Sequence, residues 1–155
     1  MCYTQNRFNA LLSACVLSLI ATAGWSQSLT WLGVLPNGRY SYAHAVSADG
    51  AVVVGVAENA AYYARAFRWT ASGGMQDLGT LGGYESGASG VSADGSVVVG
   101  WAWNAAGYSR AFRWENGVMQ DLGTLGGNWS AAHGVSADGA VVVGWAWNAA
   151  GYSRA

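Results

Sequence analysis

The chain contains no lysine and carries few charges of either sign. Its 155 residues include seven basic residues, all of them arginine, and eight acidic ones, so that charged residues make up 10% of the sequence. A net charge of −1 provides no basic field to hold a phosphate backbone, so the composition argues against nucleic-acid binding. With 52% hydrophobic and 13% aromatic residues, the composition is also the reverse of that of a disordered chain.

Cysteine is confined to the N-terminal segment, where Cys2 and Cys15 are the only two. A short polar start with one arginine leads into an apolar stretch, Phe8 to Ile20, and then into the small-x-small pattern of residues 21–23. This arrangement is typical of a secretory signal peptide at residues 1–23, because the apolar stretch is too short to span a bilayer. The mature chain would have no membrane span and no cysteine, which excludes disulfides and a cysteine-based zinc site.

Cys15 also allows a second interpretation of this segment. Residues 12–15 resemble the lipobox of bacterial lipoproteins, which would leave a lipidated Cys15 at the mature N-terminus. The sequence remains apolar over residues 16–20, however, where such proteins turn polar. We therefore expect secretion to the extracellular space or the cell surface, with the periplasm as an alternative. Removing 23 of the 155 residues leaves 132.

Internal repetition dominates the rest of the sequence. The segment Val97–Ala111 recurs without a change as Val141–Ala155. The motif Ser-Ala-Asp-Gly recurs at offsets of 45 and 44 residues, beginning at Ser47, Ser92 and Ser136. We divide the chain into repeats at about 29–74, 75–118 and 119–155. A period in the mid-forties occurs both in β-propellers and in repeats of helical pairs, so the local pattern must decide between them.

The local pattern is β throughout. Alternation along residues 141–147 places bulky residues on one face and small ones on the other: Val141, Val143, Trp145 and Trp147 against Val142, Gly144 and Ala146. Neither face is polar, so we expect the strand to be covered on both sides and its tryptophans to pack between sheets. Further strands are expected at Arg110–Trp114 and Met119–Leu125, with hairpin turns at Asp-Gly and Asn116-Gly117. The fold predicted is all-β, with about three tandem four-stranded antiparallel propeller-type blades.

Three motifs in a fixed order carry a family resemblance. Arg110–Gly117 is followed by Asp121–Gly127 and then by Gly134–Gly139 with its valine-rich strand. This succession resembles the HAF extracellular repeat of bacteria and covers the chain from about Leu29 to Ala155. The His-Ala-Phe of that family is Arg-Ala-Phe here. The resemblance implies a secreted or surface-exposed propeller-like protein, in some members attached to an autotransporter, and implies no established enzymatic activity.

The number of repeats conflicts with a closed propeller. Such rings have about four to eight blades, whereas this sequence has three repeats, the last of which reaches Arg154-Ala155 where the others continue with Phe-Arg-Trp. Three blades alone would expose apolar faces and strand edges. We therefore expect an incomplete ring that belongs to a longer protein. The alternatives are a homo-oligomer, in which two chains complete a ring of about six blades, and a curled stack of sheets.

Candidate metal-binding residues are sparse. The three Asp-Gly turns offer one carboxylate each, at Asp49, Asp94 and Asp138. Calcium takes about six to eight oxygen ligands, so we interpret these residues as turn aspartates that bond their own backbone. The pairs Gly82-Gly83 and Gly126-Gly127 lack the Lys-Ser/Thr of a phosphate loop and are interpreted as turns. We expect no metal and no cofactor.

Candidate catalytic residues are equally sparse. His44 and His133 occupy equivalent positions near a serine and an aspartate, where the middle repeat has Ser89. Neither histidine has the sequence context of a nucleophile elbow or an HExxH helix, so a secreted hydrolase is a remote alternative and we expect no catalytic residue. Four arginines are expected to be structural and to pair with Asp77 and Asp121: Arg65, Arg68, Arg110 and Arg113.

Aromatic residues of the loops provide the candidate binding site. Tyr84 and Trp129 follow Gly-Gly at homologous places and are expected on one rim, together with Tyr108 and Tyr152. Exposed aromatic faces stack well on sugar rings and on apolar groups of a protein partner. The sequence thus predicts a non-enzymatic binding or structural module at the cell surface, with an unidentified protein or glycan as partner. A lectin-like propeller that uses the loop aromatics is the alternative.

Overall fold

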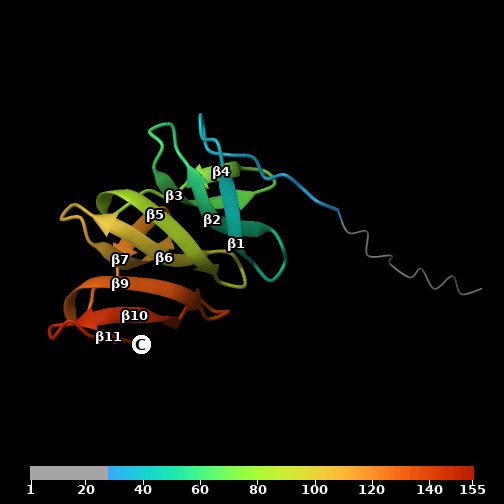
Figure 1. The fold of residues 1–155 in the computed structure, drawn as a ribbon. Coiled ribbons are helices and arrows are strands. Elements are labelled where there is room, and N and C mark those ends of the chain that lie inside the picture. The colour runs from blue at the N-terminus through green and yellow to red at the C-terminus, as the bar shows by residue number, and fades with distance from the viewer. Residues whose placement is uncertain (1–27) are drawn as a thin grey trace, which may run out of the picture. The chain divides into compact units, whose positions relative to one another are not determined.

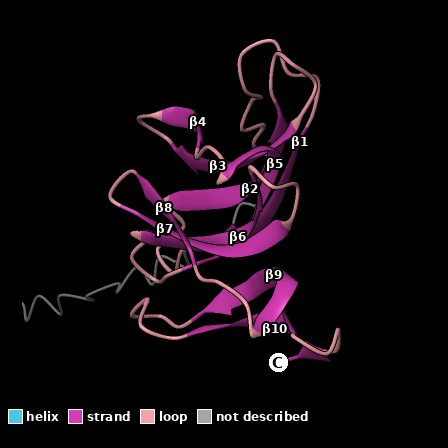
Figure 2. Cartoon of the chain, turned by 90° about the vertical axis from the view of Figure 1, so that its left-hand side faces the viewer, coloured by secondary structure: helices cyan, strands magenta, loops and turns pink. Residues whose placement is uncertain are grey.

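The computed structural model describes residues 28–155, and the predicted signal peptide at 1–23 lies outside the described residues. All regular secondary structure in the described part consists of strands, as Figures 1 and 2 show. These strands form three antiparallel sheets of four, four and three strands. Nowhere within 28–155 is there a helix long and apolar enough to cross a membrane.

Each sheet is built from strands that follow one another along the chain. The first sheet has the order β1 (Ser41–Val46), β2 (Val52–Glu58), β3 (Ala64–Thr70) and β4 (Gly74–Asp77). The second sheet has the order β5 (Gly82–Val91), β6 (Val97–Asn104), β7 (Ser109–Glu115) and β8 (Val118–Asp121). The third sheet contains β9 (Gly126–Val135), β10 (Val142–Asn148) and β11 (Ser153–Arg154). The all-β prediction with four antiparallel strands per blade is confirmed in the first two sheets.

The sheets and the sequence repeats are offset by one strand. The repeats predicted from about residues 75 and 119 begin within β4 and β8, the fourth strands of the first two sheets. Each of these sheets therefore takes its last strand from the following repeat. Such an overlap ties neighbouring repeats together through backbone hydrogen bonds as well as through side-chain packing.

The predicted hairpin turns are present. Asn116 and Gly117, with φ of 52° and 84°, are both in the left-handed region, as a two-residue type I′ turn between β7 and β8 requires. The Gly-Gly pairs, by contrast, are not turns: Gly82-Gly83 begins β5 and Gly126-Gly127 begins β9. At Gly83 a Cβ atom would lie 2.6 Å from the Cβ of Trp103. Glycine is therefore needed where β5 passes close to β6.

Apolar side chains fill the seam between the first and second sheets. Phe112 and Trp114 of β7 pack there against Val54 and Ala66 of the first sheet, and Phe112 is fully buried. On the opposite face of the second sheet, Val97 and Val99 pack against Ala132 of β9. β6 is thus covered on both faces, as its two apolar sides predict.

The third sheet departs from this prediction. Val141 and Val143, on or beside β10, are 59% and 60% exposed, because no further sheet in the described part covers that face. The strand tryptophans also pack less deeply than expected. Trp101 is half-buried against β5 of its own sheet, where a Cβ at Gly87 would lie 2.8 Å from the indole.

Two buried serines connect the sheets by hydrogen bonds. The Ser86 hydroxyl in β5 accepts a bond from the Ala66 N–H of the first sheet at 2.9 Å and donates one to the Gly79 carbonyl at 2.6 Å. Ser130 makes the same two bonds at the next seam, to Ala111 and Gly123. These bonds satisfy backbone groups that would otherwise be buried without a partner, so they fix how each sheet sits on the one before it.

The arginines confirm the expected pairing in part. Arg65 pairs with Asp77 at 3.1 Å and Arg110 with Asp121 at 3.2 Å. The prediction that Arg68 and Arg113 pair with these aspartates was wrong. Arg68 donates to the Gly95 carbonyl, and Arg113 pairs with Glu115, because both point to the opposite side of the strand from the aspartates.

Replacing Ser86 by alanine should lower the free energy of unfolding by about 1–3 kcal/mol, because two backbone groups at the seam lose their partner. Ser72→Ala, at an exposed turn position, is the matched control and should change it by less than about 0.5 kcal/mol. Chemical denaturation of both variants measures the difference. Equal effects of the two substitutions would contradict the role assigned to Ser86.

Candidate ligand-binding rim

An asparagine-capped loop joins the second and third strands of each sheet. In the first sheet, the Asn59 side-chain oxygen accepts bonds from the N–H groups of Ala61 and Tyr63 at 3.0 and 3.1 Å. Asn104 and Asn148 make the equivalent bonds in the other two sheets. The loop thereby presents a tyrosine at the same place in every sheet, at Tyr63, Tyr108 and Tyr152.

At two seams this tyrosine meets an aromatic residue from the first strand of the next sheet. Tyr63 stacks on Tyr84, with ring centroids 5.3 Å apart and an interplanar angle of 24°. Tyr108 meets Trp129 edge to face, with centroids 5.6 Å apart and an angle of 84°. The structure therefore brings three of the four predicted rim residues into aromatic pairs. The fourth, Tyr152, is exposed, and the Arg154 guanidinium carbon lies 5.2 Å from its ring centroid.

Tyr84 and Trp129 are not at homologous positions, contrary to expectation. The strand registers make Ser86 equivalent to Ser130, because these residues pair with Ala102 and Ala146. Tyr84 lies two residues before Ser86, whereas Trp129 lies one residue before Ser130. The two rings nevertheless contact equivalent tyrosines of the preceding loops, Tyr63 and Tyr108, one pair being stacked and the other edge to face.

The first seam carries a cluster of exposed aromatics that the sequence analysis missed in part. Tyr62 and Tyr84 are each 66% exposed, and Tyr63 is partly exposed between them. Tyr62 stands where the other loops have glycine, and its φ of 67° is unusual for a bulky residue. The alignment of Tyr63 with Tyr108 and Tyr152 could have revealed Tyr63 as a rim residue. The glycines aligned with Tyr62, Gly107 and Gly151, could have indicated its left-handed backbone.

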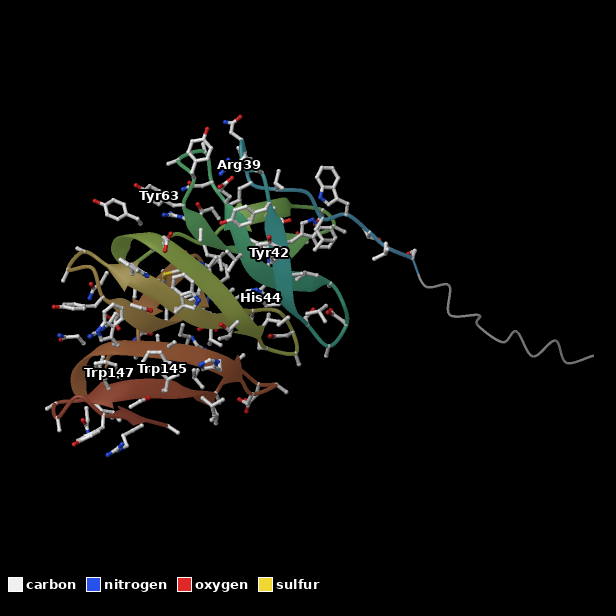
Figure 3. All side chains as sticks on the ribbon, viewed as in Figure 1. Arg39, Tyr42, His44, Tyr63, Trp145 and Trp147 are labelled. Atoms are coloured by element: carbon white, nitrogen blue, oxygen red, sulfur yellow. The ribbon has the colours of Figure 1, made fainter. Side chains whose placement is uncertain are left out.

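A cation completes this cluster. The guanidinium carbon of Arg39 lies 4.7 Å from the Tyr62 ring centroid. Its Nε and terminal nitrogen donate to the two oxygens of Glu58 at 2.8 and 2.7 Å, and these bonds hold the pKa of the Glu58 carboxyl below its ordinary value. Figure 3 shows Arg39 and Tyr63 at the same end of the first sheet. The site can therefore stack on flat apolar faces and donate hydrogen bonds beside them.

The turn aspartates are engaged within their own turns. Asp94 accepts bonds from the Ser92 hydroxyl at 2.6 Å and from the Ser96 N–H and hydroxyl at 3.0 and 2.8 Å. Asp49 and Asp138 accept equivalent bonds from a serine hydroxyl and a backbone N–H. Residues 28–155 contain no group of three or more His, Cys, Asp or Glu side chains placed to share a metal ion.

The two histidines lie in different surroundings. The Nδ1 atom of His44 is 2.9 Å from the Ala88 carbonyl oxygen across the first seam, so His44 connects two sheets. His133, at the equivalent position in β9, is exposed. In the described part of the chain, neither ring is hydrogen-bonded to a serine or an aspartate.

Comparison with known proteins identifies a fold and no family. The sequence matches no family model and no curated protein. Among solved structures, TolB from Acinetobacter baumannii is similar, with a TM-score of 0.54 and 18% sequence identity over 70% of this chain. The match covers 27% of the TolB chain. The three open sheets therefore match part of the TolB propeller, and at this level of identity the likeness concerns the fold alone.

Acid should weaken the structure through the Ser-Ala-Asp-Gly turns. The serine and backbone donors hold the pKa of Asp94 at about 2, below the value of about 3.9 expected in the unfolded chain. The stabilisation is present above pH 4 and is lost as the pH falls through about 2. Asp94→Asn should therefore lower the melting temperature at pH 7, and the difference from the native chain should shrink towards pH 2.

The matched control is Glu85→Gln, since the Glu85 carboxylate accepts no hydrogen bond within the described structure. Thermal melts of the three proteins from pH 7 to pH 2 provide the measurement. A deficit of Asp94→Asn that stays constant over this range would show that the charge of Asp94 does not stabilise the turn.

Proposed function

We propose that this chain is a secreted, non-enzymatic repeat protein that binds its partner through the aromatic rim along its propeller-type sheets. The resemblance to HAF extracellular repeats and the signal-peptide pattern of residues 1–23 support export to the cell surface or the medium. One observation carries the binding role. The same asparagine-capped loop places a tyrosine against an aromatic residue of the next sheet at two successive seams.

Such repetition favours a binding surface over a single reaction centre. Pairs of aromatics at a regular spacing can engage an elongated partner at several points, and tyrosine and tryptophan offer a large contact area for little loss of side-chain entropy. The Arg39–Glu58 pair beside the first aromatic cluster adds a fixed donor. A bulky residue held at an unfavourable φ, as Tyr62 is, also occurs preferentially where a surface is used.

A glycan is the second candidate partner, and the first seam favours it. The stacked rings of Tyr63 and Tyr84 form a flat platform, onto which the C–H face of a sugar ring could pack. The Arg39 guanidinium, 68% exposed at its side chain, lies near enough to the Tyr62 ring to donate to hydroxyl groups bound there. A lectin-like activity would therefore centre on the first seam.

Glycan-array binding by the native chain and by Tyr84→Ala and Trp129→Ala tests this function. Tyr84→Ala, at the first seam, should weaken glycan binding about three- to tenfold, the equivalent of losing one aromatic contact, whereas Trp129→Ala, at the second seam, should weaken it less. Val118→Ala, which removes an exposed apolar side chain from β8, is the matched control and should bind like the native chain. Thermal melts of all four proteins accompany the array.

The outcomes separate the candidates. Weakened glycan binding with unchanged melting temperatures supports the lectin-like function. If the chain binds a protein partner through the same residues and binds no glycan, the result supports a protein-binding role of the aromatic rim. If both substitutions lower the melting temperature sharply, or leave all binding unchanged, the aromatic pairs hold the sheets together and are not a binding rim.

A further inference from the structure

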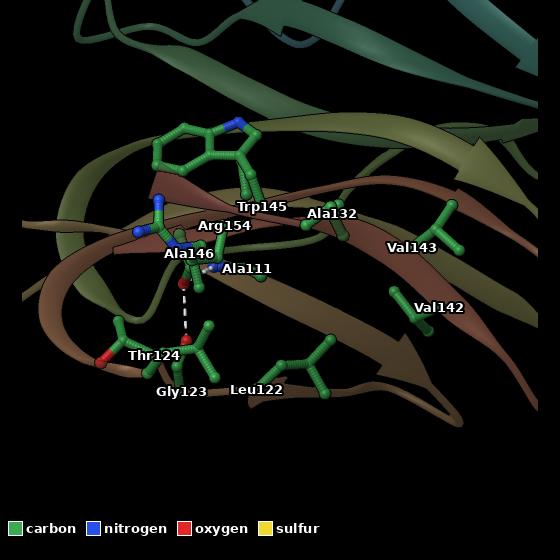
Figure 4. A pocket seen from close by; sticks show the side chains of 15 residues that line it. Ala111, Leu122, Gly123, Thr124, Ala132, Val142, Val143, Trp145, Ala146 and Arg154 are labelled. Atoms are coloured by element: carbon green, nitrogen blue, oxygen red, sulfur yellow. Dashed lines mark hydrogen bonds between the residues drawn. The ribbon is translucent and has the colours of Figure 1, made fainter. Parts of the chain in front are cut away.

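The third sheet carries an apolar groove that is separate from the aromatic rim. The groove has a volume of about 240 Å³ and lies between the β8–β9 connection, β9, β10 and β11. Leu122, Leu125, Ala132, Val142 and Ala146 are among the residues that line it. Figure 4 shows Leu122, Ala132, Val142 and Ala146 around the groove. None of the rim residues lines it.

The second sheet shows what the same place holds when it is filled. The residues equivalent to those of the groove are Leu78, Leu81, Ala88, Val98 and Ala102, and they surround the side chains of Phe112 and Trp114. Phe112 is 0% exposed and Trp114 is 8% exposed. In the first sheet, Phe67 and Trp69 pack in the same way against Leu35 and Ala57. The equivalent position in the first and second sheets therefore accommodates a phenylalanine and a tryptophan two residues apart, and the groove residues of the third sheet are of the same types.

The leucines that line the groove are more exposed than the equivalent leucines one repeat earlier. Leu78, in the β4–β5 connection, is 7% exposed, whereas its equivalent Leu122, in the β8–β9 connection, is 41% exposed. Leu125, equivalent to the half-buried Leu81, is 55% exposed. Two leucines on the wall of one groove are therefore in contact with water, which favours an apolar occupant.

The backbone beside the groove is also open. In the second sheet, β7 pairs with β6 along its whole length, from Trp103↔Ser109 to Val97↔Glu115. In the third sheet, β11 pairs with β10 only at Ala146↔Arg154 and Trp147↔Ser153. On this edge β10 has no partner strand within the described residues from Val142 to Trp145. An open strand edge is a template for a further strand.

We infer that the groove and the open edge of β10 bind an extended polypeptide strand that carries Phe-x-Trp. The strand would run antiparallel to β10, as β7 runs to β6, and residues two apart in it project to the same face. The phenylalanine would lie opposite Gly144 and the tryptophan opposite Val142, because Phe112 and Trp114 pair with the equivalent Gly100 and Val98. A small apolar molecule would fill the groove but would leave the backbone edge unpaired.

A second folded copy of this chain does not fit this description. Its Phe-x-Trp segments are in β3 and β7, which are already paired on both edges within their own sheets. Phe67 and Phe112 are 1% and 0% exposed, so neither ring is accessible for binding. The occupant is therefore a strand of repeat sequence that is not itself folded into a sheet.

The test uses a labelled synthetic peptide with the sequence of residues 112–121, Phe-Arg-Trp-Glu-Asn-Gly-Val-Met-Gln-Asp, added to the whole chain. Fluorescence anisotropy should show saturable one-to-one binding. A peptide in which Phe and Trp are both alanine should bind at least about tenfold more weakly, since it buries neither ring. Hydrogen exchange should slow at the amides of residues 142–145 when the native peptide binds.

Two exposed positions provide matched protein variants. Leu125→Asp places a charge on the wall of the groove and should weaken peptide binding at least about tenfold. Val118→Asp makes the same change on β8, outside the groove, and should leave binding unchanged. Tyr84→Ala should also leave it unchanged, which separates this site from the rim. Melting temperatures show whether each variant is folded.

Several outcomes would overturn the inference. Absence of saturable binding at about 1 mM peptide would do so, as would equal binding of the alanine peptide. Slowed exchange elsewhere in the chain would place the peptide at a different site. Sedimentation that shows a dimer which Leu125→Asp dissociates and the peptide does not would assign the groove to self-association instead.

Discussion

Burial of Phe112 at the seam between the first and second sheets is the constraint on which the packing of these two sheets depends. Phe112 extends from β7 into the space between two sheets, and there it contacts residues from both. The strand next to it must be small at the facing position, and Gly100 pairs with Phe112 across β6 and β7. A side chain at Gly100 would clash, since its Cβ would lie 2.0 Å from the Gly87 carbonyl oxygen. Glycine at position 100 therefore allows β5 to pass close to β6 beside the strand that carries the buried ring.

The polar contacts at the seam follow from this packing. Once the sheets approach closely, backbone groups at the edges of the seam lose access to water and need partners inside the protein. Ser86 and Ser130 supply them, and the N–H groups of Ala48 and Ala93 bond to the carbonyls of Ala93 and Ala137 in the following sheets. The same stacking brings the β2–β3 loop beside the start of β5. The aromatic pairs of the rim are therefore a product of how the sheets stack, as is the groove at the third sheet.

Much of the architecture could be predicted because it is local. The Asp-Gly and Asn116-Gly117 turns, the strand positions and the pairing of Arg65 with Asp77 depend on residues close in sequence or on adjacent strands of one hairpin. The errors came where a residue's role depends on packing against another strand or another sheet. Gly82-Gly83 resembles a turn, yet its glycines allow β5 to pass against Trp103. The pairing expected for Arg68 failed because its partner, the Gly95 carbonyl, belongs to the next sheet.

By itself, the sequence determined the repeat, the alternation of strands and turns, and the need to cover apolar faces on both sides, because period and residue type act through local backbone geometry. Only the tertiary structure decided which aromatics meet. Tyr84 and Trp129 differ by one position in register, and each reaches its tyrosine across a seam that no spacing within one repeat describes. The tertiary structure also decided that two strands of identical sequence have different surroundings. β6 and β10 share the sequence Val-Val-Gly-Trp-Ala-Trp-Asn, and burial separates them because only β6 lies between two sheets.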